Sequence, residues 1–204
     1  MPDLAVEEGG AWFARGVRRL AGVDEAGRGP LAGPVVAAAV VVTAQTPLIP
    51  GVADSKQLTR RRREQLAAAI VSSLPFGVGA ASAREIDRIN IRRATALAMR
   101  RALLNLPCAA DAVLIDGLPM PELGMPHEAL VGGDRRCYAI ACASILAKTV
   151  RDRGMRLLAC RYPEFGWERN VGYGTPLHLA ALRRCGPTPH HRMSFEPVAQ
   201  RALI

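Results

Sequence analysis

The chain has 204 residues, half of them hydrophobic, and a formal net charge of +9, so it can form one large domain with a proper core. The positive charge indicates an anionic partner, although a nucleic acid, an acidic protein or a membrane surface would each satisfy it. Five cysteines without CxxC spacing and no apolar run long enough to span a bilayer argue against a disulfide scaffold, a zinc site and a transmembrane protein, so we expect a soluble cytoplasmic protein.

Residues 1–18 are expected to form a loosely attached leader, ahead of a single domain over residues 19–204. The pattern that follows predicts two strands, a helix and a third strand at residues 20–24, 34–42, 59–72 and 76–81. Thr59 should cap the helix, whose first turns carry four consecutive arginines. Because cations at a helix start oppose its dipole, we expect these arginines to face a partner or solvent.

Residues 82–106 show helical spacing, and Ser82 with Glu85 forms a capping-box pattern at the start. The remaining predicted elements are two short strands and two helices, at residues 112–115, 129–131, 135–160 and 176–184. This order indicates an α/β fold with a mixed five-stranded sheet flanked by helices, and a C-terminal helical appendage from about residue 160.

Two adjacent carboxylates, Asp24 and Glu25, stand at the end of an apolar run and just before a Gly27-Arg28-Gly29 turn. Acids that face a polyanion normally repel it, so a basic protein has reason to hold this pair if a divalent metal, shared with a phosphate, neutralises it. Mg²⁺ and Mn²⁺ prefer such oxygen ligands, and no His/Cys cluster competes. The pattern therefore indicates phosphodiester chemistry.

Neighbouring residues on a strand point to opposite faces, so either the strand breaks at Glu25 or Glu25 contributes from the rim. Asp116 also closes an apolar strand, and Asp134 precedes the long helix. Each acid has an alternative interpretation: a solvated pair at Asp24 and Glu25, a hairpin turn at Asp116, and a helix cap at Asp134.

The glycine turn does not have the spacing of a dinucleotide-binding or Walker A loop. Its two glycines instead allow close approach of the backbone to a ligand, with N–H groups free to donate. The four histidines lack ligand spacing, and we expect them to be structural or to contact phosphate.

Ordered segments along nearly the whole chain resemble the type 2 ribonucleases H, that is, bacterial ribonuclease HII. They are Asp-Glu-Ala-Gly-Arg-Gly-Pro at 24–30, Asp-Ser-Lys at 54–56, Glu-Ile-Asp-Arg-Ile-Asn-Ile at 85–91, Leu-Ile-Asp-Gly at 114–117, Ala-Ser-Ile-Leu-Ala-Lys at 143–148, Gly-Tyr-Gly-Thr at 172–175 and His-Arg-Met-Ser-Phe-Glu-Pro-Val at 191–198. The resemblance implies a ribonuclease H-like catalytic domain, in agreement with the order of elements.

It also implies roles for single residues. The four carboxylates that hold divalent metal correspond to Asp24, Glu25, Asp116 and Asp134. Gly27-Arg28-Gly29 corresponds to the turn that reads the ribose 2′-hydroxyl, the group that distinguishes RNA from DNA. Tyr173 corresponds to a tyrosine that packs on the sugar beside the scissile junction, with a core tyrosine as the alternative.

Lys56 and Lys148 match positions near phosphate in the family, although Lys148 could instead pair with Asp152 at i,i+4. The chain departs from the family at Asn170 and Val171, where His-Lys is usual, and at Gly132, where a cation is common. These changes affect phosphate contacts rather than the carboxylates.

The implied activity is hydrolysis of the RNA strand of RNA–DNA hybrids, and cleavage on the 5′ side of single ribonucleotides embedded in duplex DNA. Two divalent ions, Mn²⁺ or Mg²⁺ and about 4 Å apart, would flank the scissile phosphate, and the enzyme would act as a monomer. Two alternatives remain: another nuclease of the same fold, such as a ribonuclease HIII-like or recombination nuclease, and a non-catalytic module that binds hybrids.

Overall fold

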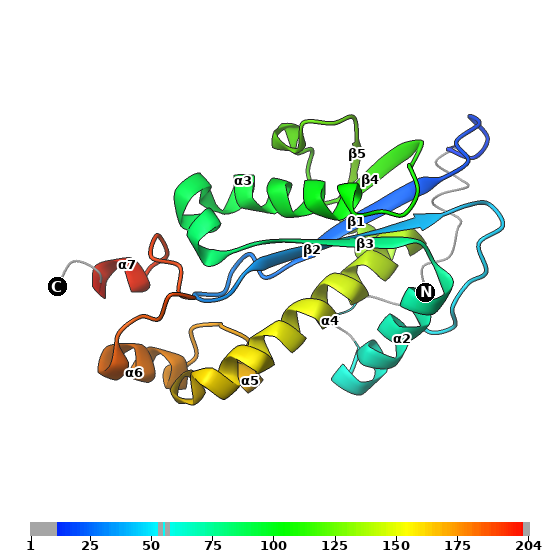
Figure 1. Ribbon diagram of the computed structural model, residues 1–204. Coiled ribbons are helices and arrows are strands. Elements are labelled where there is room, and N and C mark those ends of the chain that lie inside the picture. Colours follow the sequence, from blue (N-terminus) through cyan, green and yellow to red (C-terminus); the bar gives the residue numbers. More distant parts are fainter. Residues whose placement is uncertain (1–11, 53–54, 56–57, 202–204) are drawn as a thin grey trace.

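The structure is a computed structural model that describes residues 12–52, 55 and 58–201. Five strands form one mixed sheet in the order β3-β2-β1-β4-β5 (Figure 1). The strands are β1 (Leu20–Ala26), β2 (Val35–Val42), β3 (Phe76–Ala81), β4 (Ala112–Asp116) and β5 (Glu128–Leu130). The first three strands pair antiparallel, whereas β4 runs parallel to both β1 and β5, so the predicted mixed five-stranded α/β fold is confirmed.

The helices are α2 (Arg60–Ser73), α3 (Ala83–Leu104), α4 (Tyr138–Arg161), α5 (Trp167–Asn170), α6 (Pro176–Cys185) and α7 (Val198–Arg201), with 3-10 turns η1 (Pro121–Leu123), η2 (Gly133–Arg135) and η3 (Pro163–Phe165). In Figure 1, α3 covers one face of the sheet and α2 and α4 cover the other. None of the described helices is long and apolar enough to cross a membrane.

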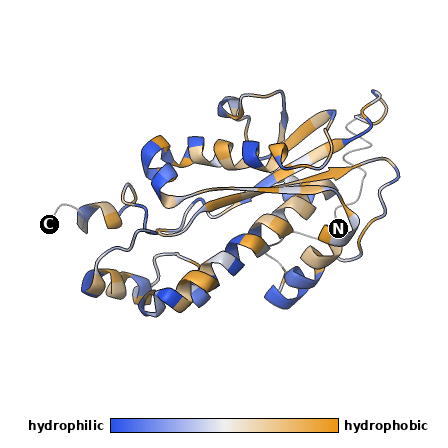
Figure 2. Ribbon diagram, in the orientation of Figure 1, coloured by the Kyte–Doolittle hydropathy of each residue, from blue (hydrophilic) through white to orange (hydrophobic). Residues whose placement is uncertain are grey.

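Successive side chains of β1 point to opposite faces of the sheet, so this strand contributes to two separate hydrophobic cores. Leu20 packs with α2 and α4, and Val23 packs with α3 on the opposite face. All eight residues of β2 are buried because that strand lies between helices on both faces, and the strands are correspondingly apolar in Figure 2. Helix α4 can lie close to β1 because a Cβ at Gly22 would collide with the backbone of Ala139 and Ile140.

The predicted caps of α2 and α3 are confirmed. The side chain of Thr59 accepts a hydrogen bond from the Arg62 N–H, and Ser82 and Glu85 form a reciprocal capping box at the start of α3. Helix α4 begins at Tyr138, three residues later than predicted, because residues 133–135 form the separate turn η2.

The arginines at the start of α2 do not all face a partner or solvent, so that prediction is wrong in part. Arg62 donates to the carbonyl of Pro50, and Arg63 donates to the carbonyl of Ser55 and to Asp152. These contacts tie the preceding loop to α2 and α4, which compensates for the unfavourable helix dipole.

Part of the expected leader lies on the core. Trp12 is buried and packs against the core between the sheet and α4, and its indole donates to Glu128 at 3.3 Å. Residues 12–17 therefore have contacts that the sequence pattern did not indicate, while residues 1–11 lie outside the described part.

The C-terminal appendage forms a third apolar cluster around Phe165, Trp167 and Leu182. Leu31 and Ala32, from the loop after the glycine turn, pack into the same cluster, and Ala32 pairs with His191 as an isolated β-bridge. The end of the chain thus returns to the turn that follows β1.

Candidate active site

Two of the predicted carboxylates lie side by side on neighbouring strands. The last paired residues of the parallel strands β1 and β4 are Val23 and Ile115, so Asp24 and Asp116 each follow that pair by one position. Two residues earlier on each strand, and so on the same face, Gly22 lies against Ala139 of α4 and Leu114 packs in the core with α4. The strand register therefore brings the two carboxylates to one edge of the sheet, on its α4 face.

Glu25 reaches the site without a break in its strand. The pairing of β1 with β2 continues through Ala26, so the alternative of a strand break at Glu25 is wrong and the rim alternative fits. The Glu25 N–H donates to Oδ1 of Asp24 at 2.7 Å, and Arg28 Nη1 lies 3.2 Å from Oε1 of Glu25. Arg28 thus holds the second carboxylate at the edge of the glycine turn.

Asp134 lies in the η2 turn and is buried. The N–H of Gly133, its neighbour, donates to Oδ1 of Asp116 at 2.7 Å. The capping alternative is wrong because Cys137 is the N-cap of α4. A hairpin at Asp116 is also wrong, since β4 and β5 run parallel.

A cleft of about 320 Å³ opens where these elements meet. It is lined by Asp24, Glu25, Ala26, Gly27, Arg28, Gly29, Ser55, Asp116, Ser144, Lys148, Arg151 and Tyr173. Asp134 is not among the lining residues, although it follows the residue that binds Asp116. A larger groove of about 680 Å³ between α2 and α4 contains none of the predicted site residues.

The electrostatics of the acids disfavour their charged forms. Burial raises the pKa of Asp24 well above its usual value, and repulsion from Glu25 and Asp116 raises it further. Burial also raises the pKa of Glu25, against the opposing effect of Arg28. A cation in the cleft would relieve both the repulsion and the lost hydration.

The acids suit a metal that substrate helps to hold. Within the described residues, no three His, Cys, Asp or Glu side chains are gathered into a group that could hold an ion alone. Mg²⁺ characteristically takes one or two carboxylates together with water and substrate phosphate, rather than a complete protein cage. The buried Asp24 and the half-buried Asp116, whose carboxylates repel each other, fit that mode of binding.

Ser144 is a site residue that the sequence analysis missed. It lies on α4, and its hydrogen bond to Asp24 lowers the pKa of that carboxyl, against the effect of burial. Its hydroxyl is also 2.9 Å from that of Ser55. Its position four residues before Lys148 on the same helix was the available signal, because i,i+4 residues share a helix face.

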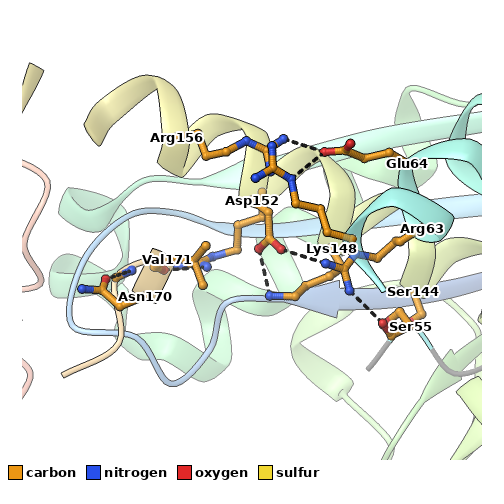
Figure 3. Close-up of polar contacts among 12 residues, drawn as sticks. Ser55, Arg63, Glu64, Ser144, Lys148, Asp152, Arg156, Asn170 and Val171 are labelled. Atoms are coloured by element: carbon orange, nitrogen blue, oxygen red, sulfur yellow. Dashed lines mark hydrogen bonds and ion pairs between the residues drawn. The ribbon is translucent and has the colours of Figure 1, made fainter. Parts of the chain in front are cut away.

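The predicted ion pair of Lys148 with Asp152 is present, and its contact with phosphate stays a prediction. Its Nζ lies 2.8 Å from Oδ1 of Asp152 and the residue lines the cleft. Figure 3 shows Asp152 between Lys148 and Arg63, which comes from α2. Lys56, the other lysine predicted to contact phosphate, lies outside the described residues.

Tyr173 lies at the surface of the cleft, so the alternative of a core tyrosine is wrong. Its residue surface is 48% exposed, and its ring is so close to Gly29 that a Cβ there would lie 3.6 Å from Cε1. Asn170, at one of the departures from the family, has a local role: its side chain bonds Phe165, Gly172 and Thr175.

His178 and His191 are buried and structural. His178 Nδ1 is 2.8 Å from the carbonyl of Tyr173, and His178 Nε2 is 3.0 Å from His191 Nε2. The N–H of Thr188 donates to His191 Nδ1. His178 therefore holds the backbone of Tyr173, and His191 in turn holds the ring of His178.

Comparison with known proteins identifies the family of the chain. The chain is 54% identical to a ribonuclease HII of Sphingopyxis alaskensis over 97% of this chain and 98% of the relative, and 52% identical to one of Paramagnetospirillum magneticum over the full length of both. The crystal structure of ribonuclease H2 from Pyrococcus horikoshii superposes with a TM-score of 0.76 at 28% identity, covering 89% of this chain and 96% of that one. The sequence model described as "Ribonuclease HII" matches residues 21–198, and the chain belongs to this family of endoribonucleases.

Proposed function

We propose that the cleft binds the RNA strand of an RNA–DNA hybrid, or a single ribonucleotide within duplex DNA, and that the chain cuts on the 5′ side of the ribonucleotide. The observation that carries the proposal is the meeting in one cleft of Asp24, Glu25 and Asp116 with the Gly27–Gly29 turn and Tyr173. The acids supply groups for hydrolysis, and the turn and the tyrosine supply groups that could recognise a sugar. The family supports action on hybrids, and the net charge of +9 favours a polyanion.

Asp24, Glu25, Asp116 and Asp134 would hold two divalent ions, Mn²⁺ or Mg²⁺, with Asp24 shared between them. When bound, such ions activate a water molecule and stabilise the leaving oxygen of the phosphodiester. Arg28 and Lys148 stay near the phosphates because Glu25 and Asp152 hold their side chains at the cleft. One chain supplies all these residues, so we also propose that the protein works as a monomer.

The test is incubation with a DNA duplex that contains one ribonucleotide, with Mn²⁺, with Mg²⁺ and with EDTA. We expect metal-dependent cleavage 5′ to the ribonucleotide, with 3′-hydroxyl and 5′-phosphate ends, and none of the matched all-DNA duplex. Cleavage of a continuous hybrid alone would indicate another nuclease of this fold. Binding without metal-dependent cleavage would indicate a non-catalytic module.

A further inference from the structure

Arg192, a buried residue of the C-terminal segment, forms hydrogen bonds with the backbone of the glycine turn. Arg192 is fully buried, and its hydrogen bonds within the described residues go to backbone carbonyls. Its Nη2 donates to Gly27 at 2.5 Å and its Nη1 donates to Arg28 at 2.7 Å. Its Nε and Nη2 also donate to the carbonyl of Gly33, at 3.1 and 3.0 Å.

These contacts fix the direction of two peptide groups. Both peptides are trans, because the cis peptide among the described residues is that before Pro197. In a trans peptide the C=O and the following N–H point in opposite directions. The carbonyls of Gly27 and Arg28 point at Arg192, so the N–H groups of Arg28 and Gly29 point away from it.

The side away from Arg192 is the cleft, which Arg28 and Gly29 line. In the described part of the chain, neither of these two N–H groups donates to a backbone carbonyl. The turn therefore presents two adjacent free donors next to the ring of Tyr173, which lies beside Gly29. Two such donors suit a hydroxyl oxygen, which has two lone pairs.

The guanidinium has a second effect on the same peptides. A cation at the carbonyl end of a peptide polarises it, so the N–H at the other end becomes a stronger donor, more so where the dielectric is low. Lysine cannot replace the arginine here, because an ammonium is a point charge, whereas the guanidinium forks across several acceptors. Burying the Arg192 guanidinium without these hydrogen bonds would cost free energy.

We propose that Arg192 is a positioning residue for substrate specificity: it orients the N–H groups of Arg28 and Gly29 to bind the ribose 2′-hydroxyl. The inference rests on the proposed function of the cleft. It adds a residue that does not touch substrate and that lies more than 160 positions from the turn in sequence.

The test compares Arg192→Lys with the wild type by binding in EDTA, where turnover is absent. The probes are a duplex with one ribonucleotide and the same duplex entirely of DNA, and the readout is the ratio of their Kd values. We expect the wild-type preference for the ribonucleotide to fall about tenfold in Arg192→Lys, the loss of one to two hydrogen bonds. The control is Ile70→Ala, which changes a buried residue of α2 that does not line the cleft; it should lower thermal stability and keep the ratio.

A folded Arg192→Lys protein with the wild-type ratio overturns the proposal, as does a wild type that cleaves the probe but shows no preference in EDTA. If Arg192→Lys does not fold, Asp87→Ala decides. Asp87 is partly buried and accepts hydrogen bonds from the N–H groups of Met193 and Ser194, so it anchors the segment next to Arg192. A reduced ratio in Asp87→Ala supports the proposal and an unchanged ratio overturns it.

The proposed function fails separately, by an absence of metal-dependent cleavage in the wild type. In that case the ribonucleotide probe is not cut under any condition, whatever the binding ratio of the Arg192 variant. Cleavage by the wild type together with an unchanged ratio would remove the role of Arg192 alone.

Discussion

The hydroxyls of Ser55 and Ser144 lie 2.9 Å apart in the interior, where the loop before α2 meets α4. Ser144 also bonds Asp24, and that bond lowers the carboxyl pKa, so Ser144 donates to Asp24 and accepts from Ser55. Two hydroxyls from separate parts of the chain thus support one buried carboxylate. The bond from Ser144 opposes the effect of burial and favours the charged form of Asp24, the form in which it can bind a cation.

Ser144→Ala should therefore weaken the site without unfolding it. The loss of a hydrogen bond to a charged group costs about 1.5–3 kcal/mol, so we expect kcat/KM on a hybrid to fall about tenfold or more. The Mn²⁺ concentration for half-maximal activity should rise as well. Ser55→Ala is the matched control, because it removes the more distant hydroxyl and should have a smaller effect. Full activity of Ser144→Ala at low metal would contradict this role.

Asp24→Asn should abolish turnover and keep hybrid binding. Because burial and repulsion disfavour the Asp24 carboxylate, its neutral replacement should also raise the thermal midpoint in EDTA by about 2–4 °C, the effect of roughly 1 kcal/mol in a chain of this size. Added Mn²⁺ should then stabilise the variant less than the wild type. Calorimetry with and without metal measures both effects.

The control for this change is Asp111→Asn. Asp111 is an acid outside the cleft whose carboxylate accepts from the N–H groups of Arg18 and Arg19. These bonds lower its pKa, so its neutral replacement should lower the midpoint instead of raising it. Substantial residual cleavage by Asp24→Asn would refute the assignment of Asp24.

Most of the fold could be predicted because its signals are local. Apolar runs of strand length, the cap at Thr59 and the capping box at Ser82 each act within a few residues, and each appears as predicted. The convergence of Asp24 and Asp116 also followed from a simple rule, since both close core strands at one sheet edge.

Contacts between distant segments could not be predicted in the same way. Arg63 and Arg192 look like surface cations in sequence, yet each binds carbonyls of a separate loop. The burial of Arg192 depends on the return of the C-terminal segment to the glycine turn, for which local periodicity carries no signal. Ser144 was missed for a related reason, because its partner is on another element.

Tyr173→Ala should reduce the preference for a single-ribonucleotide junction over a continuous hybrid. Loss of an aromatic face that packs on a nucleotide costs about 1–3 kcal/mol, so we expect the ratio of the two kcat/KM values to fall about tenfold. Tyr173→Phe keeps the ring beside Gly29 and should keep most of the preference. An unchanged ratio in Tyr173→Ala would count against the role.

The pair of His178 and His191 should make stability depend on pH. Burial, together with the neighbouring His178, lowers the pKa of His191 to about 4, whereas an unfolded histidine titrates near 6.5. Between these values the unfolded chain binds more protons than the folded one, so stability falls as the pH falls from 6.5 to 4. At pH 5 this histidine alone should reduce the free energy of unfolding by about 2 kcal/mol relative to pH 7.5.

Carboxylates contribute in the same direction at lower pH, for example Glu85, whose pKa its bonds to Arg101 and Ser82 hold at about 2. The measurement is therefore a comparison of urea unfolding at pH 7.5 and 5 for the wild type and His191→Asn. Asparagine can still accept from the Thr188 N–H but does not titrate, so the variant should be less stable at pH 7.5 and lose less on acidification. Equal losses in the two proteins would show that His191 is not held neutral by the fold.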